Sequence, residues 1–142
     1  MKFVFVSFLL SVAFSGRGQE RFVTVASGGG FSGAAVVYKI GDDGTVLKGQ
    51  GIGDNTTFNE SAKLKKCATK KYFRKTRSLL SEQQEFNHPG NIYSSITLYE
   101  NGKEKKMTWG DSAHSTPEKA KKLYGKINAS LARLTFSQNQ RK

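Results

Sequence analysis

The stretch Phe22–Ile40, FVTVASGGGFSGAAVVYKI, contains two runs of apolar and β-branched residues separated by a glycine-rich segment. Apolar and polar residues alternate in the first run, and the second run is again β-branched and aromatic, which is typical of two strands joined by a loop. Gly41–Gly44, GDDG, is a turn signal, so we expect a short third strand over Thr45–Lys48. The stretch therefore predicts a β-meander, followed by a loop over residues 49–59.

The glycine-rich segment Ser27–Gly33 has the spacing G-x-G-x-x-G, which in dinucleotide-binding proteins lets backbone amides hold a phosphate. That site requires the last glycine to open a helix, whereas here Ala34 to Tyr38 continues as a strand. A kinase-type glycine loop requires aspartate motifs that this sequence lacks. Two interpretations remain: the glycines permit positive φ in a tight connection, or they form a recognition loop whose one bulky side chain is Phe31.

The segment from Glu60 to Gln83 contains no Gly or Pro, and its apolar residues recur at nearly helical spacing. We expect an amphipathic helix with Cys67 on the apolar stripe, as a small buried side chain. The opposite face concentrates positive charge, and its candidate anion-binding residues are Lys63, Lys66, Lys70, Lys71, Arg74 and Arg77.

The second half of the chain repeats the order of strands and helix. Residues of Ile92–Glu100 alternate in period two, and Asn101–Gly102 is a strong signal for a two-residue hairpin to Lys103–Trp109. Thr116 and Pro117 are placed to begin a closing helix. The predicted order is β-β-(β)-α-β-β-α, an α+β two-layer sandwich in which two helices cover one face of an antiparallel sheet.

The N-terminus has the pattern of a secretory signal peptide, because Lys2 precedes an apolar run that is too short to span a membrane. Cleavage after Ser15 or after Gly18 fits the small residues there. With residues 1–18 as the leader, residues 19–142 form one predicted domain, secreted or periplasmic and monomeric. Cys67 is the only cysteine, so this domain has no internal disulfide.

The formal charge of the chain is +12, and loss of Lys2 and Arg17 with the leader leaves an excess of +10. Such an excess favours contact with an anionic partner. An acidic protein face, nucleic acid, lipid headgroups and acidic glycan all fit this requirement, and self-repulsion that keeps a protein soluble explains the charge equally well.

The segment Ser27-Gly28-Gly29-Gly30-Phe31-Ser32-Gly33 resembles the Ser-Gly-Gly-Phe-Ala-Gly signature of emfourin-type proteins, which are small inhibitors of thermolysin-like metallopeptidases. The resemblance covers one hairpin, and this chain has an additional glycine, a longer basic helix and a leader. It implies a non-enzymatic inhibitor that places Gly28, Gly29, Gly30, Phe31, Ser32 and Gly33 against the peptidase. The alternative is a polyanion-binding module that uses the basic helix.

For each candidate catalytic or metal-binding pattern in the sequence, a purely structural role explains the residues at least as well. His88, His114 and Asp111 lie in predicted loops, and two histidines with one aspartate are weak support for a metal site. A nucleophilic pair of Cys67 with a histidine requires an exposed thiol, which the helical pattern does not favour. We therefore expect no enzyme activity, no cofactor and no metal.

Overall fold

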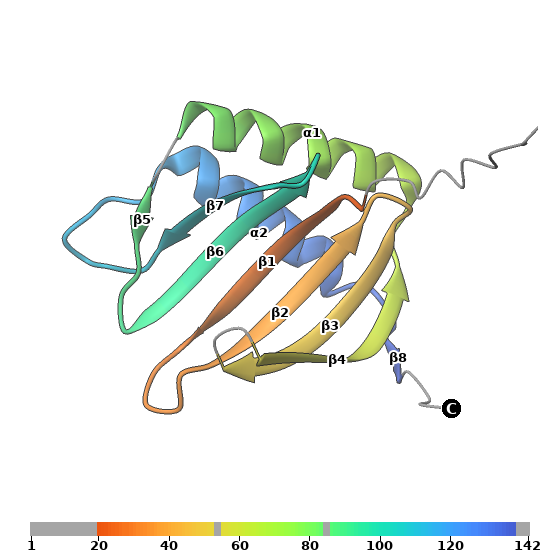
Figure 1. The fold of residues 1–142 in the computed structure, drawn as a ribbon, viewed down its shortest axis with the longest axis horizontal. Coiled ribbons are helices and arrows are strands. Elements are labelled where there is room, and N and C mark those ends of the chain that lie inside the picture. Colours follow the sequence, from red (N-terminus) through yellow and green to blue (C-terminus); the bar gives the residue numbers. More distant parts are fainter. Residues whose placement is uncertain (1–19, 53–54, 84–85, 139–142) are drawn as a thin grey trace, which may run out of the picture.

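The computed structural model describes residues 20–52, 55–83 and 86–138. The predicted signal peptide and both candidate cleavage sites lie outside the described residues. Within them the chain forms an α+β fold in which two helices pack on a mixed eight-stranded sheet (Figure 1). The elements in chain order are β1 Phe22–Gly29, β2 Ala34–Gly41, β3 Thr45–Ile52, β4 Asn55–Lys63, α1 Lys66–Glu82, β5 Asn87–His88, β6 Ile92–Glu100, β7 Lys103–Trp109, α2 Glu118–Leu131 and β8 Ser137–Gln138.

The first strand lies in the interior of the sheet, whose spatial order is β5-β7-β6-β1-β2-β3-β4-β8. Neighbouring strands are antiparallel except for β5, which pairs in parallel with the end of β7. The two halves of the chain meet where β1 pairs with β6, in a register that runs from Phe22 opposite Tyr99 to Gly29 opposite Ile92. Because β1 is bonded on both sides, the loop that follows it starts from a constrained position.

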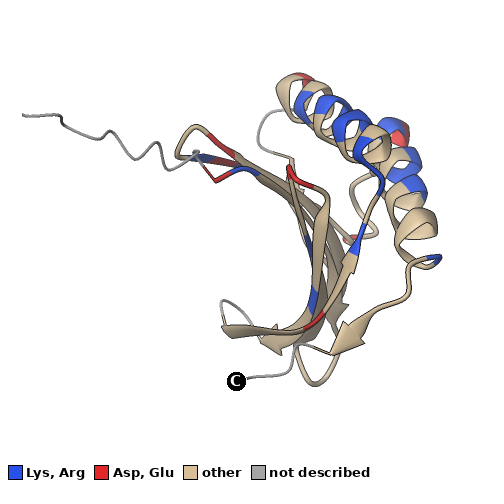
Figure 2. Cartoon of the chain, turned by 90° about the vertical axis from the view of Figure 1, so that its right-hand side faces the viewer, with Lys and Arg blue, Asp and Glu red and all other residues tan. Residues whose placement is uncertain are grey.

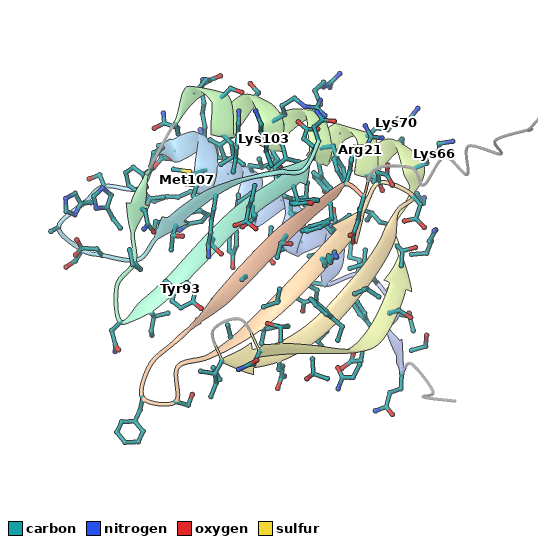
Figure 3. The ribbon with its side chains drawn as sticks, in the orientation of Figure 1. Arg21, Lys66, Lys70, Tyr93, Lys103 and Met107 are labelled. Atoms are coloured by element: carbon teal, nitrogen blue, oxygen red, sulfur yellow. The ribbon has the colours of Figure 1, made fainter. Side chains whose placement is uncertain are left out.

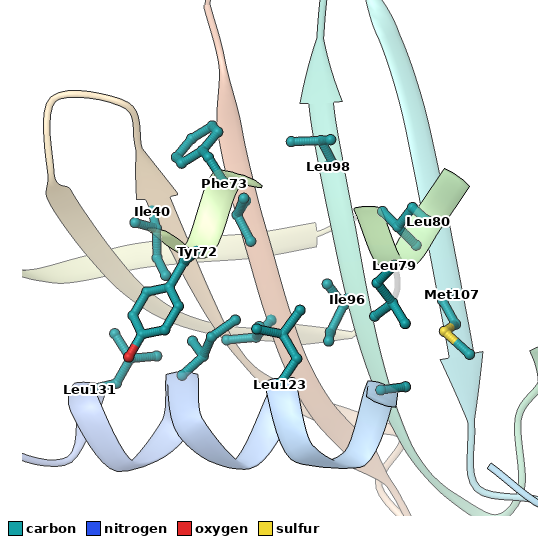
Figure 4. Close-up of a cluster of buried hydrophobic side chains, with 14 of the residues drawn as sticks. Ile40, Tyr72, Phe73, Leu79, Leu80, Ile96, Leu98, Met107, Leu123 and Leu131 are labelled. Atoms are coloured by element: carbon teal, nitrogen blue, oxygen red, sulfur yellow. The ribbon is translucent and has the colours of Figure 1, made fainter. Parts of the chain in front are cut away.

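The core lies between one face of the sheet and the two helices, which lie on the same side of the curved sheet in Figure 2. Alternate residues of β1 and β6 supply Val23, Val25, Ile96 and Leu98, all 2% exposed or less. The helices contribute residues three and four positions apart, which share one helix face. These are Tyr72, Phe73, Leu79, Leu80, Leu123, Ile127 and Leu131 (Figure 4).

Several local predictions are confirmed. Asn101 and Gly102 have φ of 55° and 72°, as a tight hairpin between β6 and β7 requires. The Gly41–Gly44 turn is closed by a hydrogen bond of 3.0 Å from the Gly44 amide to the Gly41 carbonyl.

Three strands are absent from the predicted order: β4, β5 and β8. The predicted loop over residues 49–59 is wrong, because most of it continues β3 or forms β4, although Gly53 and Asp54 lie outside the described residues. Most residues of β4 are polar and the strand lies next to the edge strand, so no apolar alternation marks it. The sheet is also mixed rather than purely antiparallel, because of the β5 and β7 pair.

The first helix begins at Lys66 rather than at Glu60. Glu60 and Lys63 belong to β4, where they lie opposite Lys48 and Thr45 of β3. The prediction that Cys67 is buried is wrong: Cys67 is an exposed free cysteine. The buried residues of α1 include Thr69, Phe73 and Thr76, and a residue in the first turn at position 67 points away from that face.

The turn before β3 contains a carboxyl group, that of Asp43, whose pKa is strongly lowered. Asp43 accepts hydrogen bonds from the hydroxyl of Thr45 at 2.6 Å and from its amide at 2.8 Å, and the Lys63 ammonium donates to it at 3.1 Å. The bonds from Thr45, followed by the bond from Lys63, lower the pKa of Asp43 from 3.8 to about 2. The ionised group thus favours the folded turn.

We expect Asp43→Ala to destabilise the protein by about 1 kcal/mol near neutral pH, a value kept small because the side chain is mostly exposed. The folded-state pKa is depressed, so this stabilisation is present above the unfolded-state pKa and is lost as the pH falls toward about 2. Urea unfolding of both proteins near pH 6 and near pH 3 measures the difference. A difference that stays constant or widens at the lower pH would contradict this assignment.

Candidate functional site

The loop between β1 and β2 has a backbone conformation that glycine favours. Gly29, Gly30 and Gly33 have φ of 108°, 74° and 64°, a region that other residues rarely adopt. A Cβ atom on Gly29 would lie 2.1 Å from the carbonyl oxygen of Asn91, so this position also lacks space for a side chain. The residue after Gly33 opens β2 rather than a helix, and the helix N-terminus of a dinucleotide site is therefore missing at this loop.

Hydrogen bonds hold the loop in place. The Gly30 amide donates to the Asn91 carbonyl at 2.7 Å, which ties the loop to the start of β6. The Gly33 amide donates to the Gly30 carbonyl at 3.2 Å, and the Ser32 hydroxyl accepts from the Ala34 amide at 3.3 Å. The loop projects beyond the end of the sheet in Figure 1. It is a constrained projection whose bulky side chain, Phe31, is held outside the core.

Phe31 is fully exposed, at 111% of its reference area, and two further large apolar side chains are exposed beside this loop. Ile52 at the end of β3 is 61% exposed, and Ile92 at the start of β6 is 68% exposed. Ile52 is opposite Ala34 in the β2 and β3 register, and Ile92 is opposite Gly29 in the β1 and β6 register. The three residues flank one end of the sheet, and we call them the apolar tip.

The apolar tip contains every exposed large hydrophobic side chain of the described residues. Single exposed hydrophobics are ordinary, but their collection at one end is characteristic of an interaction surface. The sequence signal pointed to Phe31 alone. Ile52 and Ile92 belong to strands whose ends meet the loop only after the sheet has formed, so spacing along the chain does not reveal them.

The predicted basic face is divided by the structure. Lys66, Lys70, Lys71 and Arg74 are exposed on α1, and Figure 3 shows Lys66 and Lys70 at the start of that helix. Lys63 does not belong to this face, because it lies in β4 and pairs with Asp43. Arg77 is on the helix but binds Glu100 through two hydrogen bonds of 2.8 and 2.6 Å, which lower the pKa of Glu100.

A groove between α1 and α2 collects further basic residues, and Figure 2 shows Lys and Arg along both helices. One part of it, about 320 Å³, lies between Lys75 and Glu82 on α1 and Lys119, Lys122 and Lys126 on α2. An adjoining part of about 200 Å³ shares Lys75 and Lys126 with the first part and is also lined by Lys71 and Arg133. We call the two parts the interhelical groove, and its basic residues are Lys71, Lys75, Lys119, Lys122, Lys126 and Arg133.

Only one of these groove cations has an acidic partner among the described residues: Lys119 contacts Glu82 at 2.6 Å and lowers the pKa of that carboxyl group. The other five leave an uncompensated positive charge along the groove. Of these five, only Lys71 is in the predicted set. The i, i+4 spacing of Lys122 and Lys126 was the available signal, but one helix alone does not show which neighbour its polar stripe adjoins.

The fold brings His88, Asp111 and His114 together at the edge of the sheet that β5 forms. His88 lies in β5 rather than in a loop, and the other two lie between β7 and α2. One potential ligand atom from each residue lies within 4.8 Å of the others. Cys67 does not belong to this group, so the structure provides no Cys and His pair among the described residues.

No protein-family model matches this chain, and a search of curated proteins finds no similar sequence. None of the helices in the described ranges is long and apolar enough to cross a membrane. The features of the described residues that bear on function are therefore the apolar tip and the positively charged interhelical groove.

Proposed function

We propose that this chain is an exported, monomeric, non-enzymatic binding protein that docks on another protein through the apolar tip. The single observation that carries the proposal is the complete exposure of Phe31 on a loop held by a hydrogen bond from the Gly30 amide to the carbonyl of Asn91, just before β6. An aromatic side chain presented on a constrained loop loses little conformational entropy on binding, and such residues are frequent anchors of interfaces. In this proposal the sheet and its two helices form a two-layer sandwich that serves as the scaffold for the loop.

The most specific form of the proposal is an emfourin-like inhibitor of thermolysin-like metallopeptidases. Phe31 enters an apolar pocket of the peptidase cleft, and the exposed backbone of the loop pairs with the enzyme as an extended peptide does. Ile52 and Ile92 contact the peptidase on either side of Phe31, at the periphery of the interface. The positive helices accelerate the approach to an acidic enzyme surface and affect the association rate more than the final affinity.

Inhibition of thermolysin by the purified protein without its leader tests this form. We expect activity to fall with added protein until an equimolar complex is reached, and the complex to elute as one species in size-exclusion chromatography. Full peptidase activity at a several-fold excess of the protein, with no complex, would contradict inhibition. Capture of a different protein through Phe31 would retain the docking tip and reject the peptidase as its target.

A second candidate function is supported by a separate observation, the five uncompensated cations of the interhelical groove. A continuous row of Lys and Arg side chains between two helices suits the phosphate backbone of a nucleic acid or the sulfates of a glycan. In this alternative the chain binds a polyanion along the helices, and the apolar tip has no part in the contact.

We expect binding of a single-stranded oligonucleotide at low salt, with an affinity that falls by about three powers of ten for a tenfold rise in salt. The double variant Lys75→Glu and Lys126→Glu should weaken binding at least about tenfold and reduce the salt dependence. Lys103→Glu with Lys106→Glu is the matched control, because it changes the net charge equally on exposed residues of β7. Equal losses in both double variants would reject the groove in favour of net charge.

A further inference from the structure

The chain has two histidines in 142 residues, and the fold places them in contact although 25 residues separate them in sequence. The rings of His88 and His114 are stacked with centroids 3.8 Å apart and planes 10° from parallel. Nδ1 of His114 lies 2.6 Å from Oδ2 of Asp111. One potential ligand atom of each of the two imidazoles and of the carboxylate thus lies within 4.8 Å of the others.

The backbone builds this arrangement. β5 runs parallel to the end of β7, so that His88 is opposite Trp109, and the Asp111 amide donates to the His88 carbonyl at 3.0 Å. The segments that follow β5 and β7 also approach each other closely, since a Cβ on Gly90 would lie 2.3 Å from the Gly110 carbonyl oxygen. The loop with Asp111 and His114 is consequently fixed to the strand with His88.

Hydrogen bonds from its neighbours orient Asp111. Its Oδ1 accepts a hydrogen bond of 3.0 Å from the Ala113 amide, which leaves Oδ2 directed to His114. The Ala113 amide, and then the His114 ring, lower the pKa of this carboxyl group. Phe86 packs edge-on against the His88 ring with centroids 4.8 Å apart and supplies an apolar wall beside the cluster. Of the three residues, His114 is exposed, and His88 and Asp111 are half-buried.

We propose that His88, Asp111 and His114 form a binding site for a divalent transition-metal ion of the zinc class. Two nitrogens and one oxygen are the donor set that such ions prefer, at about 2.0 to 2.2 Å from the metal. Binding requires the imidazoles to rotate out of their stack so that both ring planes point at the ion, and His114 is exposed enough to turn. Three protein ligands leave one tetrahedral position for water or for a group of a partner.

Without a metal the same contacts would serve only as a clamp between β5 and the loop that leads to α2. The two alternatives differ in what an added ion does. A metal site binds one equivalent of zinc and holds both rings in coordination, whereas a clamp leaves both rings stacked. Coordinating oxygen and nitrogen groups are also held by their own hydrogen bonds in metal sites, so the bond from Ala113 to Asp111 is compatible with either role.

Calorimetric titration with Zn²⁺ of the protein without a polyhistidine tag tests the site, because the chain then contains no other histidine. We expect one equivalent to bind, and His114→Gln and Asp111→Asn each to weaken binding about tenfold or more. Cys67→Ser is the matched control for the exposed thiol and should bind as the unaltered protein does. Equal zinc binding by His114→Gln, or its loss in Cys67→Ser, would overturn the proposal.

A second measurement does not depend on the variants. Nitrogen resonances of the two histidine rings in a ¹⁵N-labelled protein report directly on coordination. We expect one equivalent of Zn²⁺ to shift a nitrogen of each ring, in slow or intermediate exchange. Shifts confined to one ring, or no shift at a several-fold excess of zinc, would leave the clamp as the only role of the cluster.

Discussion

Replacing Phe31 with alanine is expected to weaken the proposed association with a thermolysin-like peptidase by about 30-fold or more, the effect of losing a central aromatic anchor. Phe31 makes no contribution to the core, since its side chain is fully exposed. The thermal stability of the variant should therefore match that of the unaltered protein. The loss should appear mainly as faster dissociation, because the charges that steer the approach are unchanged.

Surface-immobilised peptidase measures both rate constants for the variant and for its controls. Phe31→Tyr retains the aromatic ring and should keep most of the affinity. Ile52→Ala and Ile92→Ala lie at the sides of the tip and should each have smaller effects than Phe31→Ala. Equal affinity of Phe31→Ala and the unaltered protein would exclude Phe31 as the anchor, even if the protein inhibits the enzyme.

Gly110→Ala is expected to destabilise the fold by about 3 kcal/mol or more, the largest effect on stability that we predict for a surface residue. Gly110 has φ of 153°, and a Cβ atom there would lie 2.1 Å from the Ile92 carbonyl oxygen and 2.9 Å from the Tyr93 Cα. These are backbone atoms of β6, so no side chain can move aside. Relief of the clash would require the end of β7 to separate from β6.

The matched control is Gly125→Ala on α2, where a Cβ would meet no atom within 4 Å. Alanine has the higher helix propensity, so this variant should be more stable than the unaltered protein by roughly 0.5 to 1 kcal/mol. Chemical denaturation of both variants compares the same substitution at the two positions. A Gly110→Ala protein as stable as the Gly125→Ala protein would contradict the close approach of β6 and the segment after β7.

The part of the fold that could be predicted is the part in which local signals agree with the tertiary structure. The β6–β7 hairpin has alternating apolar residues and an Asn-Gly turn, and in α2 the apolar residues Ala120, Leu123, Ile127 and Leu131 recur every three or four positions and are buried. In β4 the signals are absent, because a polar strand near the edge buries little surface. Cys67 lies at nearly helical spacing from other apolar residues, but the buried face of α1 is the one with Thr69, Phe73 and Thr76, and position 67 is on the other side.

The candidate sites divide in the same way. Phe31 could be identified from the sequence, since a bulky residue among glycines has few structural roles. The partners of Phe31 in the apolar tip, and those of Lys71 in the interhelical groove, come from elements distant along the chain. His88 and His114 come into contact through the parallel pairing of the two-residue β5 with β7. A strand of two residues is too short to show a periodic pattern in the sequence.

In the proposed complex, the Gly28–Gly33 loop enters the binding site of a peptidase. The most direct test replaces Phe31 with a photoreactive phenylalanine and irradiates the mixture with thermolysin, with the same photoreactive residue at Lys71 as the comparison. The proposal predicts a cross-link from position 31 to residues of the peptidase cleft, abolished by a small active-site inhibitor, and little cross-linking from position 71. Cross-linking from position 71 alone, or from neither position, would contradict it.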